Sequence, residues 1–500
     1  MQTFSAEGFA AVLALVGMVI VIAALLSGFI ERSSFPQVAV FLALGAVLGP
    51  AGLGLLDITL ESPILRVVAT LSLALVLFTD AVSLSVTEIR RHLGLALRVL
   101  GPGTLISTAL IALAGWGLLG LGVPEAVLLG AALASTDPVL LRGLLRRGES
   151  IPGAARQALR LESGLNDVVL LPIVLVAMAF LDNKPPENAG EWAHLGLNLF
   201  VLGPGAGVLV GLLGVATLDL VRRRAGVRRD YESLYSLGLA FAAFAAAEAM
   251  HGSGFLAAFA AGLTIAALDV ELCDCFLEYG ETTAEMALLF TFVLLGSSLI
   301  WSGFALVGVA ALVFAVITLL SRPLAFLLAL ARADLEPRAR RLIAWFGPRG
   351  LSSLLLVLLP VFAGLPGSDR LFSLCSLVVV FSVVLHGGSL MLPSRDVPQR
   401  GAPSVPLPIE KESEPVAAAE GAGEDADALD IDAERVTLAG MRDLVQAGRP
   451  VLVLDVRSER SYNESDQHAV GALRLHPDRA ADQAAERGLP RDAWLLAFCR

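Results

Sequence analysis

Charged residues are scarce in this chain. Of its 500 residues, 17% are Asp, Glu, Lys or Arg and 56% are hydrophobic, whereas about a quarter of the residues in a typical soluble domain are charged. This shortage excludes a soluble globular protein as the main body of the chain. Together with a mean hydropathy of +0.75, it indicates an integral membrane protein.

Cysteine and positive charge are also in short supply. There are 4 cysteines, and the one close pair, Cys273 and Cys275, lacks the second pair that a zinc site needs. The formal net charge of −11 argues against nucleic-acid binding. The first apolar stretch has neither a basic leading region nor a small-residue cleavage site, so we expect a membrane span there and not a signal peptide.

Apolar stretches long enough to cross a bilayer recur through the first 392 residues, separated by short polar or Gly/Pro breaks. Each is roughly 20 residues long, which is the length a transmembrane helix requires. The sequence predicts an all-α polytopic fold of about 13 spans, at residues 9–30, 36–54, 63–86, 95–121, 124–145, 157–181, 194–221, 232–250, 253–269, 283–301, 303–331, 339–363 and 370–392.

Basic residues fall mainly in the odd-numbered loops between these spans. Short loops rich in Lys and Arg stay in the cytoplasm, so we expect the N-terminus outside, the C-terminus inside, and a location in the plasma membrane. The ninth loop is acidic and departs from this pattern, but acidic residues weigh little in the rule. The basic residues are Arg90, Arg91, Arg98, Arg142, Arg146, Arg147, Arg156, Arg222 to Arg224, Arg228, Arg229, Arg332, Arg338, Arg340 and Arg341.

Composition divides the chain into three parts. Residues 1–393 form the transmembrane domain. Residues 394–433 are rich in Pro, Ala, Glu and Asp and cannot bury enough apolar surface to fold, which predicts a disordered linker. Residues 434–500 return to an alternating helix and strand pattern, which predicts a small cytoplasmic α/β domain.

Polar residues interrupt span five at mid-length. Ser135, Thr136, Asp137 and Pro138 lie between apolar residues on both sides. An acid at bilayer depth is expensive unless it is paired or coordinated, so it marks a functional site. Proline breaks the helix there, and the carbonyls freed at such a break can bind a cation. The alternative is an ordinary helix cap, in which Asp137 is followed by proline in the first turn.

Span six begins with a second polar cluster, Glu162, Ser163, Asn166 and Asp167. Glu162 and Asn166 are four residues apart, as are Ser163 and Asp167, so both pairs lie on one helical face. If this face meets span five, Asp167 lies beside Asp137 in an oxygen-rich pocket for a monovalent cation. Two carboxylates close together in a low dielectric favour the protonated form of one of them, so that a proton and a cation compete for one site.

Glycine and proline interrupt span twelve as they interrupt span five. The segment reads Trp345-Phe346-Gly347-Pro348-Arg349-Gly350, and seven spans separate the two breaks, which fits the inverted repeats of many secondary transporters. A buried Arg349 needs an acid, and we expect Glu162 to pair with it. The alternative is that the Arg349 side chain extends to the membrane interface.

These three motifs, in this order, resemble those of the monovalent cation:proton antiporters, in the sodium/proton exchanger branch that carries Asn-Asp in span six. The resemblance covers roughly residues 10–392. It implies a homodimer of thirteen-helix subunits, and it implies that Asp167 binds the cation or the proton while Thr136, Asp137 and Ser163 help to coordinate it. Asn166 replaces a second acid and implies electroneutral exchange. The family also pairs an acid at Glu162 with an arginine at Arg349.

The resemblance predicts a transporter and not an enzyme, with no cofactor and with Na⁺, or K⁺ or Li⁺, as the cation exchanged for H⁺ in pH and sodium homeostasis. The Na⁺ is expected at Asp167 and Asp137. Relatives place an acid directly after Leu-Phe in span three, whereas here Thr79 intervenes before Asp80. Asp80 therefore either assists the site or caps its helix.

The C-terminal residues resemble a rhodanese-like domain. The resemblance rests on Leu454-Asp455-Val456-Arg457 after an apolar strand and on Phe498-Cys499-Arg500 after another. In that family the cysteine accepts a sulfane sulfur inside a loop of backbone amides. That loop would follow Cys499, so we expect no sulfurtransferase activity from these residues and leave the partner of the tail unknown. Two alternative functions are a K⁺/H⁺ antiporter regulated by the tail and a membrane-tethered sulfurtransferase-like sensor.

Overall fold

The computed structural model divides the chain into two units, Met1–Pro398 and Gln399–Arg500. It describes residues 37–84, 92–137, 152–182, 186–225, 229–268, 274–333 and 335–391, and shorter pieces at 17–18, 21–22, 25, 89, 141, 441, 444, 449–456, 472–475, 483–484, 487, 489–490 and 493–498. Most of the first expected span, all of the expected linker, Pro138 and Cys499 therefore lie outside the described residues.

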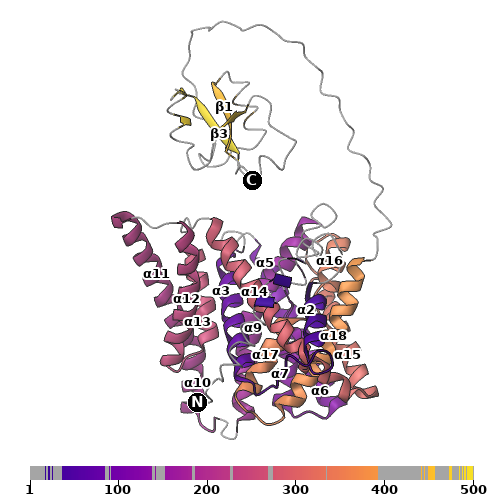
Figure 1. Ribbon diagram of the computed structural model, residues 1–500. Coiled ribbons are helices and arrows are strands. Elements are labelled where there is room, and N and C mark those ends of the chain that lie inside the picture. The colour runs from indigo at the N-terminus through magenta and orange to yellow at the C-terminus, as the bar shows by residue number, and fades with distance from the viewer. Residues whose placement is uncertain are drawn as a thin grey trace. The chain divides into compact units, whose positions relative to one another are not determined.

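The first unit is built of helices (Figure 1). Its first half contains α2 (Gln37–Leu48), α3 (Pro63–Val82), α5 (Leu93–Arg98), α6 (Thr104–Leu119), α7 (Val123–Ala134) and α9 (Gly153–Leu181). A π-helical turn, η1 (Val99–Gly103), joins α5 to α6 and contains Pro102. A proline there removes one backbone hydrogen bond, which the wider turn accommodates without ending the helix.

The second half of the unit continues in the same way. It contains α10 (Ala189–Leu197), η3 (Asn198–Leu202), α11 (Gly203–Ala225), α12 (Arg229–Ala249), α13 (Gly254–Ala267), α14 (Asp274–Ser297), η4 (Leu299–Leu306), α15 (Val309–Ala329), α16 (Pro337–Trp345), α17 (Leu351–Phe362) and α18 (Ser368–Met391). Expected span twelve thus consists of two helices, α16 and α17, with a break at residues 346–350. The break predicted from Gly347 and Pro348 is confirmed.

Among the described residues, 6 helices are long and apolar enough to cross a membrane, and a seventh span results if the pair Thr282–Ser297 and Leu299–Leu306, bent by 46°, is counted as one. Shorter apolar helices lie at Gln37–Leu48, Val123–Ala134, Leu234–Ala249, Gly254–Ala267 and Leu351–Phe362. The polytopic helical architecture is therefore confirmed, and about thirteen spans stays a prediction. In expected span five, α7 ends at Ala134 where the polar residues begin, as the predicted break requires, and most of the second half of this span lies outside the described residues.

Small residues allow several helices to approach closely. A side chain at Gly45 of α2 would overlap the backbone of α14 at Val293 and Gly296, and one at Gly207 of α11 would overlap the backbone of α13 at Ala257. In a membrane, water does not drive helices together, so close packing of this kind supplies much of the attraction between them.

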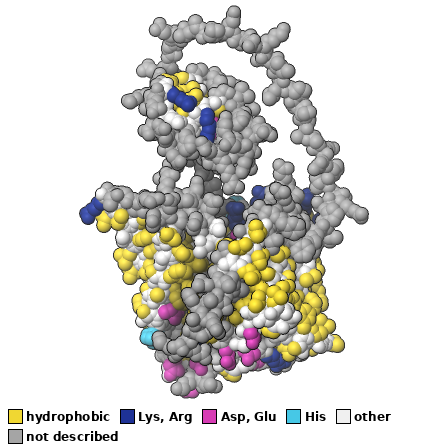
Figure 2. Space-filling view, in the orientation of Figure 1, with side chains coloured by type: hydrophobic (Ala, Val, Ile, Leu, Met, Phe, Trp, Pro, Cys, Tyr) yellow, Lys and Arg dark blue, Asp and Glu magenta, His cyan; other side chains and the backbone are white. Residues whose placement is uncertain are grey.

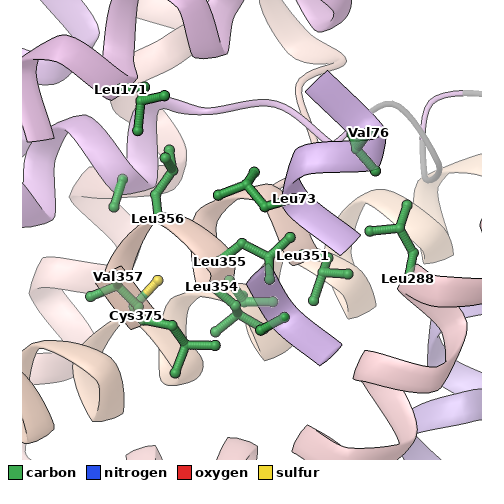
Figure 3. Packing of buried hydrophobic residues seen from close by; sticks show 14 of the residues in the cluster. Leu73, Val76, Leu171, Leu288, Leu351, Leu354, Leu355, Leu356, Val357 and Cys375 are labelled. Atoms are coloured by element: carbon green, nitrogen blue, oxygen red, sulfur yellow. The ribbon is translucent and has the colours of Figure 1, made fainter. Parts of the chain in front are cut away.

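The core of the unit is centred on α17. Figure 3 shows Leu351, Leu354 and Leu355 of this helix packed among side chains of α3, α14 and α18, including Leu73, Leu288 and Cys375. These residues belong to one buried hydrophobic cluster. Because α17 begins immediately after the break, this packing fixes the position of the break itself.

Charge is unequally distributed along the helices of the first unit. In Figure 2 the acidic side chains in view gather at the lower end of the helical unit, whereas Lys and Arg in view lie mainly at its upper end. Hydrophobic side chains cover the surface between the two ends. This arrangement fits a protein whose middle faces lipid and whose two ends face water.

The second unit contains a three-stranded parallel sheet in the order β2-β1-β3, built from β1 (Val451–Asp455), β2 (Leu473–Arg474) and β3 (Trp494–Phe498). Leu454 pairs with Leu473 on one side and with Ala497 on the other. Parallel strands on both sides of β1 fit the α/β pattern expected of the tail. The Asp455 side chain is buried and lies 3.8 Å from Arg474 Nη1.

The crossing of α2 and α14 provides a test of the packing. Gly45→Ala places a methyl group against the α14 backbone, so we expect it to lower the free energy of unfolding by about 1–3 kcal/mol, the usual effect of overpacking. Gly117→Ala on α6 is the matched control, because a side chain there meets open space and should be neutral or slightly stabilising. Thermal unfolding in detergent measures both; equal melting temperatures for the two variants would contradict this packing.

Candidate ion-binding site

The first break follows α7. That helix ends at Ala134, and Ser135 has extended backbone torsions (φ −61°, ψ 141°). The proline at position 138 disfavours helical torsions in the residue before it, Asp137. Ser135, Thr136 and Asp137 are all at most 1% exposed. The last carbonyls of α7 are therefore left without helical partners deep inside the protein.

The second break crosses the first. The Asp137 N–H donates to the Pro348 carbonyl at 2.9 Å, and the Leu351 N–H donates to Asp137 Oδ2 at 2.6 Å. The second of these bonds places a carboxylate at the N-terminus of α17, where the helix dipole and the unpaired N–H groups favour negative charge. Asp137 thus joins the two broken spans through its backbone and its side chain.

Three polar side chains of α9 reach the first break. Ser135 Oγ donates to Asp167 Oδ1 at 2.7 Å, and Asn166 Nδ2 donates to the Thr136 carbonyl at 3.3 Å. Thr136 Oγ1 donates to Glu162 Oε1 at 2.8 Å. The face of span six predicted from the four-residue spacing therefore meets span five as expected, and Asp137 is close enough to Asp167 for a Coulombic interaction.

The partner predicted for Glu162 is wrong. The Glu162 carboxylate forms a bidentate ion pair with Arg322 of α15, with 2.6 Å between Oε2 and Nη2. Arg322 Nη1 also donates to Thr136 Oγ1 at 3.1 Å, and the guanidinium carbon lies 4.0 Å from the ring centre of Phe326. Two parallel N–H···O bonds make this the stronger kind of charge-assisted contact.

Arg349 binds backbone carbonyls and does not form the expected ion pair with Glu162. Its Nη1 donates to the carbonyls of Ala134 at 2.6 Å and Ser135 at 3.1 Å. The physical reason is that the end of α7 leaves buried carbonyls that need donors. The side chain is 1% exposed, so the alternative of an arginine that extends to the interface is also wrong.

Oxygen atoms of several kinds lie in the part of the site that contains Asp167. The Ser135 hydroxyl donates to the Asp167 carboxylate, the Asp137 carboxylate interacts with it electrostatically, and the next residue along α9, Asn166, donates to the Thr136 carbonyl. Asn166 is fully buried, and its Oδ1 has no hydrogen-bond partner among the residues described. A buried carbonyl oxygen without a donor carries a free-energy penalty that a bound cation would remove. Hard monovalent cations bind oxygen ligands of this sort.

Two of the predicted site residues lie less directly at the breaks. Ser163 Oγ donates back to the Arg160 carbonyl of its own helix at 3.2 Å, so the structure does not show it as part of the Asp167 contacts. Asp80 lies on α3, two residues before that helix ends, and is half-buried.

A family model described as "Sodium/hydrogen exchanger, transmembrane" matches residues 17–394. The chain belongs to this family. It is a monovalent cation:proton antiporter, and thus a transporter and not an enzyme, and the cation and proton are its substrates. The rhodanese-like character of the tail lies outside the matched residues.

Individual relatives of the antiporter are distant in sequence. The K(+)/H(+) antiporter NhaP of Alkalimonas amylolytica is 27% identical over 404 residues, which cover 79% of this chain and 68% of that protein. The K(+)/H(+) antiporter NhaP2 of Shewanella oneidensis is 29% identical over 399 residues, covering 78% and 67%. The solved structure of the sodium proton antiporter MjNhaP1 from Methanocaldococcus jannaschii at pH 8 superposes with a TM-score of 0.62 at 21% identity, covering 76% of this chain and 99% of that one. That likeness establishes the antiporter fold.

Sequence reasoning identified Arg322 as an intramembrane charge but assigned it no role, and two glycines of the second break show how charged side chains are accommodated there. Gly347 packs directly against the Arg322 side chain, where a Cβ atom would overlap the guanidinium. Gly350 packs in the same way against the Asp137 carboxylate. The signal was present in the antiporter sequence, because Arg322 is a charged residue in the middle of an apolar span. Both glycines of the second break leave room for charges from other helices.

A double-mutant cycle tests which arginine pairs with Glu162. Removing one partner of a buried pair leaves an uncompensated charge, so Arg322→Gln should lower the free energy of unfolding by about 3–5 kcal/mol. The coupling energy between Glu162→Gln and Arg322→Gln should exceed the coupling energy between Glu162→Gln and Arg349→Gln. Thermal or denaturant unfolding in detergent measures both cycles, and a larger coupling for the Arg349 cycle would contradict the assignment.

Proposed function

We propose that this protein exchanges one monovalent cation for one proton at Asp167, without net movement of charge. The observation that carries the proposal is the position of Asp167: in the middle of α9, 5% exposed, and hydrogen-bonded through Oδ1 to Ser135 of a broken helix. A carboxylate at that depth needs a proton or a cation to balance it.

The charges buried around the two breaks support one-for-one exchange. Asp137, Glu162 and Asp167 are acids, and Arg322 and Arg349 are cations, all at most 5% exposed. When every group is ionised, this set carries one net negative charge. Glu162 is paired with Arg322, the Asp137 carboxylate is bound at the α17 N-terminus, and Arg349, bonded to the carbonyls at the end of α7, supplies the second buried positive charge. One proton or one monovalent cation at Asp167 therefore makes the buried set neutral.

A site that is electrically neutral when its ion is bound favours alternating access. Moving a buried net charge through a medium of low dielectric is costly, whereas moving a neutral set is not. The antiporter would then change its exposure with either ion bound and rarely when empty. Asn166 matters for the same reason, because an acid in its place would add a second negative charge.

We further propose Na⁺ as the most favourable cation, with K⁺ as the specific alternative. Two relatives are named K(+)/H(+) antiporters and one structural neighbour a sodium proton antiporter. Oxygen ligands of similar kind suit Na⁺, K⁺ and Li⁺, which differ mainly in the cavity they need. Initial rates with each of the three cations, at equal concentration, separate the candidates.

The proposal includes the assembly and topology expected from the sequence. The antiporter would work as a homodimer in the plasma membrane, with the N-terminus outside and the tail in the cytoplasm. The three-stranded parallel sheet of the second unit supports a rhodanese-like regulatory module, although Cys499 lies outside the described residues. Such a module would sense a ligand and adjust transport.

Asp167→Asn tests the transport site. The amide neither binds a proton at physiological pH nor balances a cation, so we expect cation-driven proton flux to fall by about a hundredfold or more. The measurement is the recovery of an internal pH dye in proteoliposomes after cation addition. Asp182→Asn, at the C-terminal end of α9 and about four turns from Asp167, is the matched control and should transport like the wild type. Undiminished flux in Asp167→Asn would contradict the proposal.

A further inference from the structure

The break at residues 346–350 is attached to α18 as well as to α7. The Arg349 N–H donates to Ser382 Oγ at 2.7 Å. Both residues are at most 1% exposed. Because this bond holds the Arg349 backbone, it also determines where the Arg349 side chain meets the carbonyls of Ala134 and Ser135.

Ser382 is in turn bonded to a histidine one turn further along α18. His386 Nδ1 lies 3.1 Å from Ser382 Oγ and 3.1 Å from the Ser382 carbonyl. Ser382 Oγ already accepts the Arg349 N–H, so its own proton is available for His386 Nδ1. When Nδ1 accepts that proton, the neutral ring carries its own proton on Nε2, and the Ser382 carbonyl is then a neighbour of Nδ1 and not its hydrogen-bond partner.

The His386 ring also contacts the other end of the break. Trp345 is the last residue of α16. The centre of its ring lies 5.8 Å from the centre of the His386 ring. The backbone of Trp345 is also hydrogen-bonded to the His386 side chain. The Trp345 carbonyl is the available acceptor, because it lies at a helix C-terminus. It accepts Gly347 N–H at 3.1 Å and has a second lone pair for the Nε2–H of the ring.

We infer that Ser382 and His386 are positioning residues that clamp both ends of the break in span twelve, Ser382 at Arg349 and His386 at Trp345. Neither touches the site at Asp167. They act through the break. Within it, Arg349 donates to the Ala134 carbonyl at the end of α7. Leu351, the first residue after the break, donates its N–H to Asp137 Oδ2. The effect on transport rests on the proposed function, whereas the clamp itself is a statement about the structure.

The two nitrogen contacts of the His386 imidazole can be removed one at a time by substitution with Asn or Gln. In His386→Asn the amide occupies roughly the position of Nδ1 and keeps the contact with Ser382, whereas in His386→Gln it occupies that of Nε2 and keeps the contact with Trp345. His386→Leu removes both contacts, and Ser382→Ala removes the acceptor of the Arg349 N–H. Ser376→Ala is the matched control: this serine is fully buried in α18, and its Oγ has no hydrogen-bond partner within the described part of the chain.

Amide hydrogen exchange in detergent tests the clamp without reference to transport. We expect the peptide covering residues 346–350 to exchange about tenfold faster in His386→Leu and Ser382→Ala, as for the loss of one hydrogen bond. The Asn and Gln variants should fall between these and the wild type, and Ser376→Ala should match the wild type. Unchanged exchange in both His386→Leu and Ser382→Ala would overturn the clamp.

Transport kinetics then test the positioning role. We expect KM for the cation to rise about three- to tenfold in His386→Leu and Ser382→Ala, with a smaller change in kcat, and to recover partly in the Asn and Gln variants. The double variant should be no worse than the worse single one, since both residues hold the same segment. A fall in kcat that follows melting temperature at constant KM would overturn the positioning role. Absence of cation-driven flux in the wild type would instead refute the proposed function, and hydrogen exchange would still decide the clamp.

Discussion

The burial of five ionisable groups at the crossing of two broken helices is the constraint on which the rest of the structure depends. Asp137, Glu162, Asp167, Arg322 and Arg349 are each at most 5% exposed. Charges at that depth are tolerated only when each is paired, capped or neutralised. The two breaks supply what is needed, because they release backbone carbonyls for Arg349 and backbone N–H groups for Asp137. In the proposed function, Asp167 is the acid that the transported ion neutralises.

This constraint explains features that look unrelated in the sequence. The glycines at 347 and 350 leave space for Arg322 and Asp137. The apolar core around α17 fixes the helix whose N-terminus receives the Asp137 carboxylate. In the proposed function, the packing around α17 keeps the geometry of the site while the ion bound at Asp167 changes.

Much of the site was predictable from residue spacing. The four-residue intervals in α9 predicted that Glu162, Asn166 and Asp167 would share a face, and proline and glycine predicted both breaks. The pairing of Glu162 was not predictable, because two buried arginines lie on different spans and sequence does not say which helix crosses α9 at that depth. The pairing depends on three-dimensional packing. Arg322 on α15 faces the Glu162 carboxylate, whereas Arg349 donates to the buried carbonyls that the end of α7 leaves without helical partners.

The charge balance at Asp167 is the central claim, and it can be measured directly. Purified protein in weakly buffered detergent, prepared with Asp167 protonated, is titrated with the transported cation while released protons are counted with a pH indicator. The account predicts about one proton released for each cation bound, because one negative charge remains after the two arginines are counted. Release of two protons per cation, or binding of the cation with none released, would contradict it.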